Sequence, residues 1–244
     1  MINFPDLDAA DPSPESNETL NQVTPFADLS SAGRELALKL APYREGDNVV
    51  VLGIVLGGVP VAREVANFLR APLDLVIIRR LLAPQGPGSQ ICAVNIGGSM
   101  VIDKVLIPRP AVPSTPLDHF TNEAIVELGR REQNCRRGRP PTDLAGKTVI
   151  LVDCGIRSGS TMLAAIRAIR TQEPARIIAA VPVASFGGHA AIASLVDELV
   201  CLARPRPFGH VGLWYKDFTR PEDDRVGEVL AKLPSVSSET MTLL

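Results

Sequence analysis

The chain has 244 residues, of which 45% are hydrophobic and 21% are charged, values typical of a globular protein rather than a disordered or fibrous one. Lys and Arg total 25 against 27 Asp and Glu, and the formal net charge of −2 gives no reason to expect a broad nucleic-acid or anionic-membrane surface. Four cysteines without CxxC or Cys/His spacing support neither a structural zinc site nor a disulfide framework. The length predicts one large domain with at most a small annex.

Residues 1–27 are predicted to form a flexible acidic tail. They contain four prolines and little apolar periodicity. The first 33 residues have no Lys or Arg and so lack the basic and then apolar order of a signal peptide. Together with the cysteine pattern, this favours the cytoplasm as the compartment, and no membrane partner is expected.

The folded part is predicted to begin near Leu29 and to end near residue 234, before a flexible C-terminus at 235–244. A short amphipathic helix is expected over 31–41, capped by Ser30 or Ser31. Residues 48–55 form a β-branched run typical of a strand buried on both faces of a parallel sheet. The further predicted elements are strands at 73–78, 148–152, 176–183 and 198–202, and helices at 59–70, 162–170 and 188–195. Strands that alternate with helices predict an α/β fold with a mainly parallel sheet and helices on both faces.

The region 81–122 is different, because it is rich in Pro and Gly and has only two weak strands, at 91–96 and 100–106. We expect a flap or β excursion over the site. A helix predicted at 121–134 leads into a basic cluster that contains Arg130, Arg131, Arg136, Arg137 and Arg139. Such a cluster is typical of a solvated helix end, but it could also steer phosphorylated substrates or contact RNA.

The most informative segment is VILVDCGIRSGST at residues 149–161. A buried strand leads to an acid and then to a Ser/Gly/Thr turn that opens a helix. Backbone N–H groups at such a helix start form a cradle suited to a monophosphate. Asp153 at the strand tip can accept hydrogen bonds from vicinal hydroxyls, or hold a water on a divalent cation. A phosphosugar would fit both the phosphate cradle and Asp153. The alternative is an ordinary capped helix that binds nothing.

This segment resembles the diphosphoribosyl-binding signature of the type I phosphoribosyltransferases, where a hydrophobic strand leads into two acids and a T-G-x-T-like turn. Further matching pieces follow the family's order at 57–62, 79–84, 138–141 and 211–218. The resemblance covers about residues 30–230 and is closest to a bacterial group usually described by the family name alone. It implies the family's fold over residues 28–234, with the flap at 81–122 and a small C-terminal hood at 204–234.

The resemblance implies a glycosyltransferase of nucleotide metabolism. In the family's reaction, a nitrogen nucleophile displaces pyrophosphate from phosphoribosyl diphosphate through an oxocarbenium-like ribose. Mg²⁺ is the implied cofactor and is bound mainly through the substrate, so no residue is expected to ligate the metal directly. The implied partners are phosphoribosyl diphosphate and an unidentified nitrogen acceptor, such as a nucleobase. A homo-oligomer is also among the expected assemblies, whereas no nucleic-acid partner is favoured.

The resemblance also assigns roles to individual residues. Asp153 would be the catalytic residue and would bind the ribose hydroxyls. The other implied site residues are Ser158, Gly159, Ser160 and Thr161 for the 5′-phosphate, Gly57, Gly58, Arg79 and Arg80 for pyrophosphate, and Val211 and Trp214 for the base. Four of the ten aromatic residues lie within 208–218, and Trp214 offers the largest ring for stacking. The alternative is that these aromatics plug an edge of the core.

The chain departs from the family pattern at four positions. Leu56 replaces an Arg before the paired glycines, Gly88 a Glu in the flap, Cys154 the second acid and Arg157 a small residue of the turn. Cys154 could be a thiol activated by the helix start and by Arg157, or a small packed one. These departures favour, as an alternative, a catalytically degenerate protein that binds a phosphoribosyl ligand or nucleotide as a sensor or regulator. A third interpretation, an RNA-binding regulator, rests on the arginine cluster alone.

Overall fold

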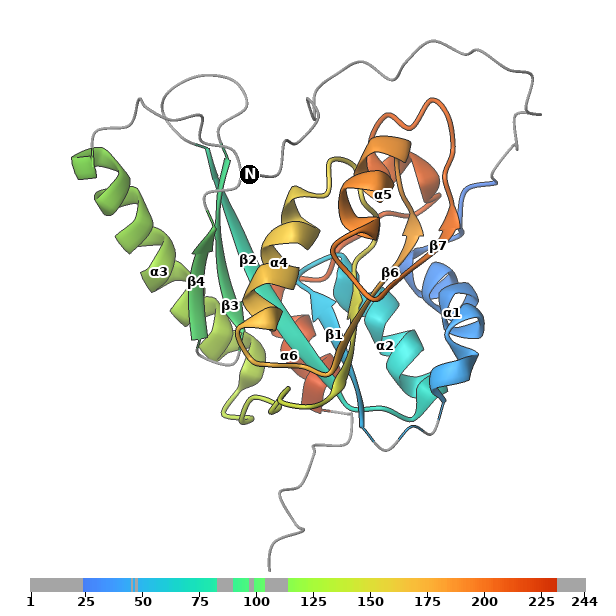
Figure 1. Ribbon diagram of the computed structural model, residues 1–244, viewed down its shortest axis with the longest axis horizontal. Coiled ribbons are helices and arrows are strands. Elements are labelled where there is room, and N and C mark those ends of the chain that lie inside the picture. Colours follow the sequence, from blue (N-terminus) through green and yellow to red (C-terminus); the bar gives the residue numbers. More distant parts are fainter. Residues whose placement is uncertain are drawn as a thin grey trace, which may run out of the picture.

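The computed structural model describes residues 24–44, 46, 48–82, 90–96, 99–103 and 114–231. Its centre is a seven-stranded sheet in the order β4-β3-β2-β1-β5-β6-β7 (Figure 1). The strands are β1 (Val49–Ile54), β2 (Leu73–Leu82), β3 (Gln90–Ile96), β4 (Ser99–Asp103), β5 (Thr148–Val152), β6 (Arg176–Val183) and β7 (Glu198–Ala203). Five of them, β2, β1, β5, β6 and β7, pair in parallel, whereas β3 and β4 extend the β2 edge in antiparallel pairing. The expected mainly parallel α/β sheet is confirmed.

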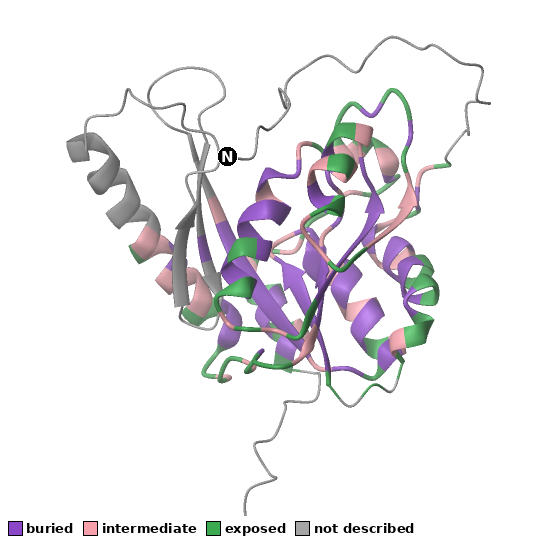
Figure 2. Cartoon of the chain, viewed as in Figure 1, coloured by how far each residue is buried: buried purple, intermediate pink, exposed green. Residues whose placement is uncertain are grey.

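Helices cover both faces of this sheet. They are α1 (Leu29–Lys39), α2 (Gly58–Leu69), α3 (Ser114–Arg136), α4 (Ser160–Arg170), α5 (Phe186–Ala193) and α6 (Asp223–Ala231). Successive side chains of a strand point to opposite faces, so each central strand contributes side chains to two hydrophobic cores, one on each face of the sheet. Val51 packs with α1 and α2, whereas Leu52 packs with α4 on the other side. Figure 2 shows the central strands buried between helices whose outer sides are exposed.

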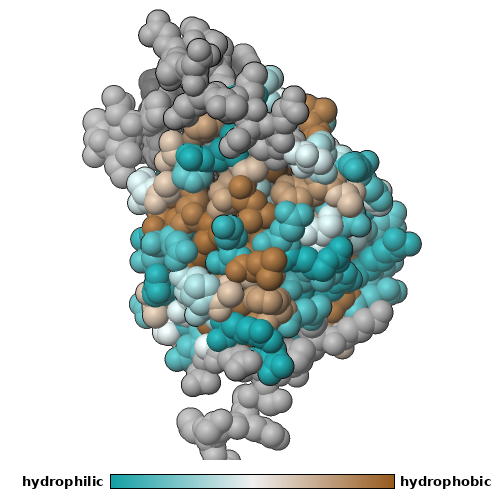
Figure 3. Space-filling view, turned by 90° about the vertical axis from the view of Figure 1, so that its right-hand side faces the viewer, coloured by the Kyte–Doolittle hydropathy of each residue, from teal (hydrophilic) through white to brown (hydrophobic). Residues whose placement is uncertain are grey.

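The edge strand β7 is covered less completely than the strands in the middle of the sheet. Its residues from Leu199 to Ala203 are only partly buried, whereas every residue of β1 is buried. The side of the molecule on which α1 and β7 lie presents apolar side chains within a hydrophilic surround (Figure 3). Leu38 of α1 is an exposed apolar residue, with 65% of its surface accessible. In the described part of the chain β7 is therefore a sheet edge that α1 and α5 cover only in part.

The first helix is capped by Asp28 rather than by one of the expected serines. The Asp28 carboxylate accepts the Ser31 N–H at 2.6 Å, and the Ser31 hydroxyl accepts the Asp28 N–H at 2.9 Å. This reciprocal pair satisfies two backbone donors and moves the helix start to Leu29. Just before it, the Phe26 N–H donates to the Trp214 carbonyl at 2.9 Å. Packed structure thus begins at Phe26, earlier than the expected tail boundary; residues 1–23 and 232–244 lie outside the described residues.

The middle region contains more regular structure than the sequence indicates. Helix α3 begins at Ser114, inside the segment assigned to the flap. Pro116 is a loop signal in the sequence, but proline is tolerated in the first helical turn, where N–H groups have no intrahelical partner. The connections 83–89 and 104–113, which include Gly88, lie outside the described residues, so the flap itself stays a prediction.

The basic cluster at the end of α3 binds α6 and the start of β2. Its contacts with α6 are the ion pair of Arg131 with Asp223, and the hydrogen bonds of Arg137 and Arg139 with the carbonyls of Asp224 and Leu230. Arg136 is buried and forms an ion pair with buried Asp74 at 2.8 Å. The cluster therefore has a packing role within the chain, which neither the solvated-end nor the RNA interpretation includes.

We expect Arg136→Ala to lower the free energy of unfolding by about 3 kcal/mol, because it leaves Asp74 buried without its cation. This is the low end for a broken buried pair, since the backbone N–H groups of Leu75 and Thr142 still reach the carboxylate, each at 2.7 Å. Urea denaturation measures the loss. The control Arg137→Ala removes a half-exposed guanidinium from the same helix end and should cost less than about 1 kcal/mol. Equal losses for the two variants would contradict the assignment.

Candidate functional site

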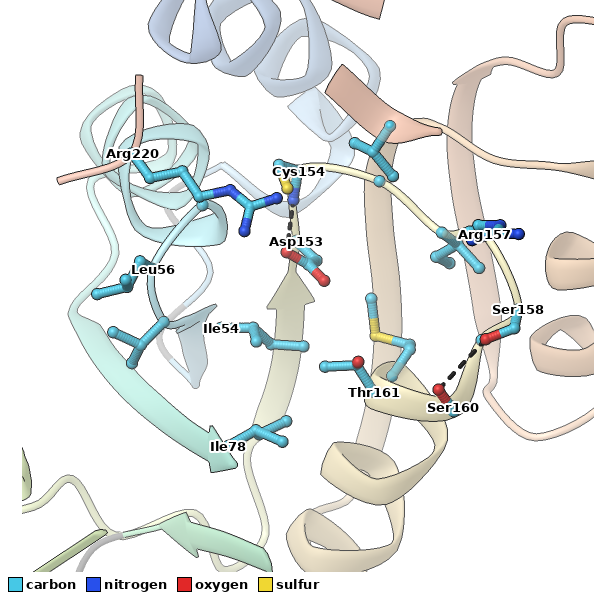
Figure 4. Close-up of a pocket in the computed structure, with 17 residues that line it drawn as sticks. Ile54, Leu56, Ile78, Asp153, Cys154, Arg157, Ser158, Ser160, Thr161 and Arg220 are labelled. Carbon is cyan, nitrogen blue, oxygen red and sulfur yellow. Dashed lines mark hydrogen bonds between the residues drawn. The ribbon is translucent and has the colours of Figure 1, made fainter. Parts of the chain in front are cut away.

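A pocket lies at the carboxyl ends of β1 and β5, where open α/β sheets bind their ligands. The chain leaves β1 toward α2 on one face and leaves β5 toward α4 on the other, so the two loops diverge. The cavity is about 200 Å³. Sites for drug-sized ligands typically measure ~300–1,000 Å³, so this cavity, which is partly open to solvent, has room for a sugar phosphate, and a larger ligand would extend into its open side. Its lining comes from residues 54–57, Ile78, residues 153–162, Val211 and Arg220 (Figure 4).

The four predicted phosphate residues come together in this pocket. Gly159 precedes α4 with φ +83°, a left-handed conformation that favours glycine, and Ser160 begins the helix. The hydroxyl oxygens of Ser158 and Ser160 lie 3.2 Å apart, and Thr161 follows on the same wall (Figure 4). The first turn of α4 and its hydroxyl groups thus line the cavity, an arrangement suited to an anion.

Asp153 follows β5 and is the only acidic residue among those that line the described pocket. Its Oδ1 accepts the N–H of Cys154 at 2.7 Å, which fixes the orientation of the carboxylate. In Figure 4 this carboxylate lies between Arg220 and Thr161. Because the side chain is only partly buried, it can accept a hydrogen bond from a ligand hydroxyl or from a metal-bound water.

The paired glycines pack the loop after β1 against the end of β5. A Cβ at Gly58 would lie 2.6 Å from the carbonyl oxygen of Val152, and a Cβ at Gly57 would lie 2.8 Å from the Sγ of Cys154. Both distances are far below van der Waals contact, so no larger residue fits without moving the loop. Gly57 lines the pocket and Gly58 does not. This packing requirement stands beside the predicted pyrophosphate role, which stays a prediction.

Sequence reasoning missed Arg220, which enters the pocket from the hood, between the 3-10 turn Val211–Trp214 and α6. Its guanidinium carbon lies 4.6 Å from the ring centroid of Phe218, and its Nε lies 3.6 Å from the place of a Cβ on Gly57. Figure 4 shows it on the same side of the site as Leu56, where the expected arginine is missing. No local sequence signal distinguishes Arg220, because its position depends on how the hood folds back.

The predicted pyrophosphate arginines are not part of the pocket lining. Arg79 forms an ion pair with Glu127 of α3 and lies outside the residues that line the cavity. The side chain of Arg80 lies outside the described part of the structure. Arg79 thus has a counter-charge on a neighbouring helix, and the ligand role of both arginines stays a prediction.

The two predicted base-binding residues lie in the same 3-10 turn, but only one of them lines the pocket. Val211 lines the pocket, whereas Trp214 packs against Phe208 with ring centroids 6.3 Å apart. The Trp214 Nε1–H donates to the carbonyl of Phe208 at 3.0 Å. The tryptophan thus has a packing role in the hood, and its stacking on a base stays a prediction.

Cys154 is a packed thiol rather than an activated one. It is buried, its Sγ lies close to Gly57, and the Tyr215 hydroxyl donates to its carbonyl at 2.5 Å. Burial, and then the charge of Asp153, raises the pKa of the Cys154 thiol well above its ordinary value. Of the two alternatives that the sequence leaves open, the structure thus supports the small packed thiol and not the thiol activated by the helix start and by Arg157. Arg157 lies exposed at the pocket rim, and burial outweighs any cation near the sulfur.

The mainly parallel sheet, with an acid at the tip of β5 and a Ser/Gly/Thr turn that opens α4, is the fold expected of a phosphoribosyltransferase. The sequence model of the family described as "Phosphoribosyl transferase domain" matches residues 21–211 of this chain. The chain belongs to this family, which confirms the resemblance given by its motifs.

Relatives agree with this assignment. Two proteins from strains of Mycobacterium tuberculosis, each named "Putative phosphoribosyl transferase", are 38% identical over 201 residues, which is 82% of this chain and 45% of theirs. The chain therefore spans about half the length of these curated relatives. The crystal structure of TT1426 from Thermus thermophilus has 33% identity and a TM-score of 0.72, with 87% of this chain and 100% of that chain covered.

Two further features concern membranes and metals. None of the helices in the described part of the chain is both long and apolar enough to span a bilayer. Within the same residues, no group of three or more His, Cys, Asp and Glu side chains is arranged to hold a metal ion.

We expect Cys154 to be alkylated by iodoacetamide at pH 8 at least about tenfold more slowly in the folded protein than in the urea-unfolded chain. The raised pKa keeps the thiol protonated at this pH, and packing blocks access to it. Peptide mass spectrometry follows each cysteine separately. Cys201, whose pKa burial raises to about 11, is an internal control that should also be slow when folded. Reaction of folded Cys154 at the unfolded rate would contradict the packed arrangement.

Proposed function

We propose that this chain transfers the phosphoribosyl group from phosphoribosyl diphosphate to a nucleobase or related nitrogen acceptor, with release of pyrophosphate. The observation that carries the proposal is one pocket lined by the 158–161 turn, by Asp153 and by the hood residue Val211. This pocket combines a turn that can bind an anion, a carboxylate that can accept hydrogen bonds from hydroxyl groups, and a hood residue that can cover the acceptor. A phosphosugar donor and a flat acceptor need these three features together.

In this proposal the chain holds the ribose by two ends. The 158–161 turn binds the 5′-phosphate at the N-terminus of α4, where the helix dipole favours an anion. Asp153 accepts hydrogen bonds from the ribose hydroxyls, and an ionised acceptor makes such bonds strong. Fixing both ends orients the reacting carbon toward the acceptor, which lowers the entropic part of the barrier.

The reaction breaks the bond between C1′ and the pyrophosphate oxygen, and the bonding electron pair leaves with pyrophosphate. The lone pair of the acceptor nitrogen forms the new C1′–N bond, and any proton on that nitrogen passes to water. Negative charge grows on the leaving group while the bond breaks. Arg220 of the hood lies beside Gly57 and supplies a positive charge to the leaving pyrophosphate. The loop after β1 does not supply this charge itself, because Leu56 is uncharged.

Mg²⁺ fits this site through the substrate rather than through a ligand cage. The ion usually keeps several waters and combines one or two carboxylates with substrate phosphates. Asp153 is the single carboxylate that lines the described pocket, so it would hold a metal-bound water at most. When bound, the ion supplies charge neutralisation on the pyrophosphate.

A second candidate function is a catalytically degenerate protein that binds a phosphoribosyl ligand or nucleotide as a sensor or regulator. Cys154 favours it, because the second acid of the family's pair is replaced by a thiol buried beside Gly57. A coupled assay of pyrophosphate release, run with phosphoribosyl diphosphate, Mg²⁺ and a panel of nucleobases, separates the two candidates. Turnover with any base excludes the degenerate protein, whereas binding without release across the panel favours it.

Asp153→Asn should weaken the affinity for phosphoribosyl diphosphate by about 1–3 kcal/mol, because the charge-assisted hydrogen bonds to the ribose are lost. Isothermal titration calorimetry with Mg²⁺ measures the affinity. Glu228→Gln removes an exposed carboxylate from α6 and is the matched control, with no change expected. Unchanged affinity of a folded Asp153→Asn variant would refute the role of Asp153. Absence of binding to the unaltered protein would refute the proposed function.

Arg220→Gln should weaken the binding of phosphoribosyl diphosphate about tenfold and leave ribose 5-phosphate binding unchanged. The two ligands differ in the pyrophosphate group, so their comparison isolates the contact assigned to Arg220. Arg225→Gln, which removes an exposed arginine of α6, is the control for net charge. Equal losses for both ligands would show that Arg220 supports the pocket rather than the leaving group.

A further inference from the structure

Two arginines lie over one phenylalanine ring beside the candidate site. The guanidinium carbon of Arg206 is 3.7 Å from the ring centroid of Phe186, and that of Arg204 is 5.0 Å from it. Both arginines are exposed. We call Phe186, Arg204 and Arg206 the arginine platform. Neither arginine forms an ion pair with a carboxylate of the described residues, so two positive charges are held near each other without an acid between them.

Among residues 174–216 only Asp197 and Glu198 are acidic, and their carboxylates accept hydrogen bonds from the Ile177 N–H and the Tyr43 hydroxyl. No Asp or Glu occurs at 174–196 or at 199–216, the two segments that contain α5, most of β7 and the start of the hood. The charge of Arg204 acts on His189 of α5, whose pKa lies below its ordinary value because of burial first and of Arg204 second. In contrast, Arg131 and Arg136 each meet a carboxylate. The platform therefore differs from the arginines that hold the fold together.

The platform adjoins the pocket without being part of it. The hydroxyl of Ser185, next to Phe186, donates to the carbonyl of Arg157, and a Cβ at Gly188 would clash with the same oxygen. Arg157 lines the pocket, whereas none of the three platform residues does. In Figure 4 the Arg157 side chain lies on the far side of the loop from Asp153. The platform thus lies next to the loop residue Arg157, on the side away from the cavity.

We infer that the arginine platform is a second anion site, which binds a phosphate group of a small ligand separately from the pocket. Guanidinium groups present their N–H donors in a planar fork that matches phosphate oxygens. Stacking on Phe186 limits the orientations of Arg206 before a ligand arrives, and this reduces the entropy lost on binding. A doubly charged phosphate offsets both cations, whereas a carboxylate offsets only one.

The test is a titration of the full-length, ¹⁵N-labelled protein with inorganic phosphate at constant ionic strength. The backbone N–H signal of Gly187 reports on the platform, and that of Gly159 reports on the phosphate turn. We expect the Gly187 signal to shift and saturate. The double variant Arg204→Gln/Arg206→Gln should weaken that response about tenfold or more and leave the Gly159 response unchanged.

Two further variants separate the platform from general charge. Arg130→Gln/Arg225→Gln removes two exposed arginines from α3 and α6, so it has the same net charge as the double variant. It should leave the Gly187 response unchanged. Phe186→Leu keeps both charges and removes the aromatic ring, and it should weaken the response a few-fold.

His189 gives an independent readout. Bound phosphate offsets the charge of Arg204, so the pKa of His189 should be higher in phosphate than in chloride of equal ionic strength. The inference is overturned if the Gly187 shifts do not saturate, if the charge control weakens them equally, or if His189 does not respond. Binding of a single-stranded oligonucleotide without a response to inorganic phosphate would also overturn it. These readouts use no phosphoribosyl diphosphate, so failure to bind that donor would refute only the proposed function.

Discussion

The close approach of the loop after β1 to the end of β5 is the constraint on which the site depends. The two strands are parallel neighbours in the middle of the sheet, with Val51 beside Ile150. Their chains continue to helices on opposite faces, and such a switch point opens a crevice in any open α/β sheet. What is particular here is that Gly57 and Gly58 let the loop lie against the backbone and thiol that follow β5. A side chain at either glycine would separate that loop from Asp153 and widen the pocket.

The hood covers this crevice because it is held at both ends. At its start, Phe26 exchanges backbone hydrogen bonds with Trp214 and Lys216, and the Tyr215 hydroxyl bonds the carbonyl that follows Asp153. At its end, α6 is fixed by Arg131 of α3 and by Arg137 and Arg139, which follow α3. Arg220 lies between these two anchors and is positioned by both. The cluster that the sequence offers as a candidate RNA contact therefore supports the part of the chain that brings a cation to the pocket.

The strands and the phosphate turn could be predicted because their signals are local. A strand buried on both faces is a continuous apolar run, as at 148–152 and 176–183, and the 158–161 turn combines a glycine conformation with a helix start. The features that could not be predicted depend on partners distant in sequence. Arg79 meets Glu127 of α3, and Arg220 reaches the loop at Gly57 only after the hood has folded. Cys154 is recognisable as a departure, but only its packing shows that burial raises its pKa. The cap of α1 lies between the local and the distant signals. Asp28, Ser30 and Ser31 are near neighbours that could each cap the helix, and the reciprocal hydrogen bonds between Asp28 and Ser31 decide that Asp28 does so.

The net charge of the chain is near zero, yet two sets of its arginines differ in their surroundings. Arg79, Arg131 and Arg136 meet carboxylates, so most of their field is cancelled close to its source. Four others line the pocket or form the platform behind its rim, without an ion pair to a described carboxylate: Arg157, Arg204, Arg206 and Arg220. No described carboxylate cancels the charges of this second set, and salt screens exposed charges beyond about 10 Å at 0.1 M ionic strength. Each of them therefore acts on a ligand that is already at the rim. A chain with a formal charge of −2 can in this way favour phosphates at one edge of its sheet without presenting a surface that binds polyanions broadly.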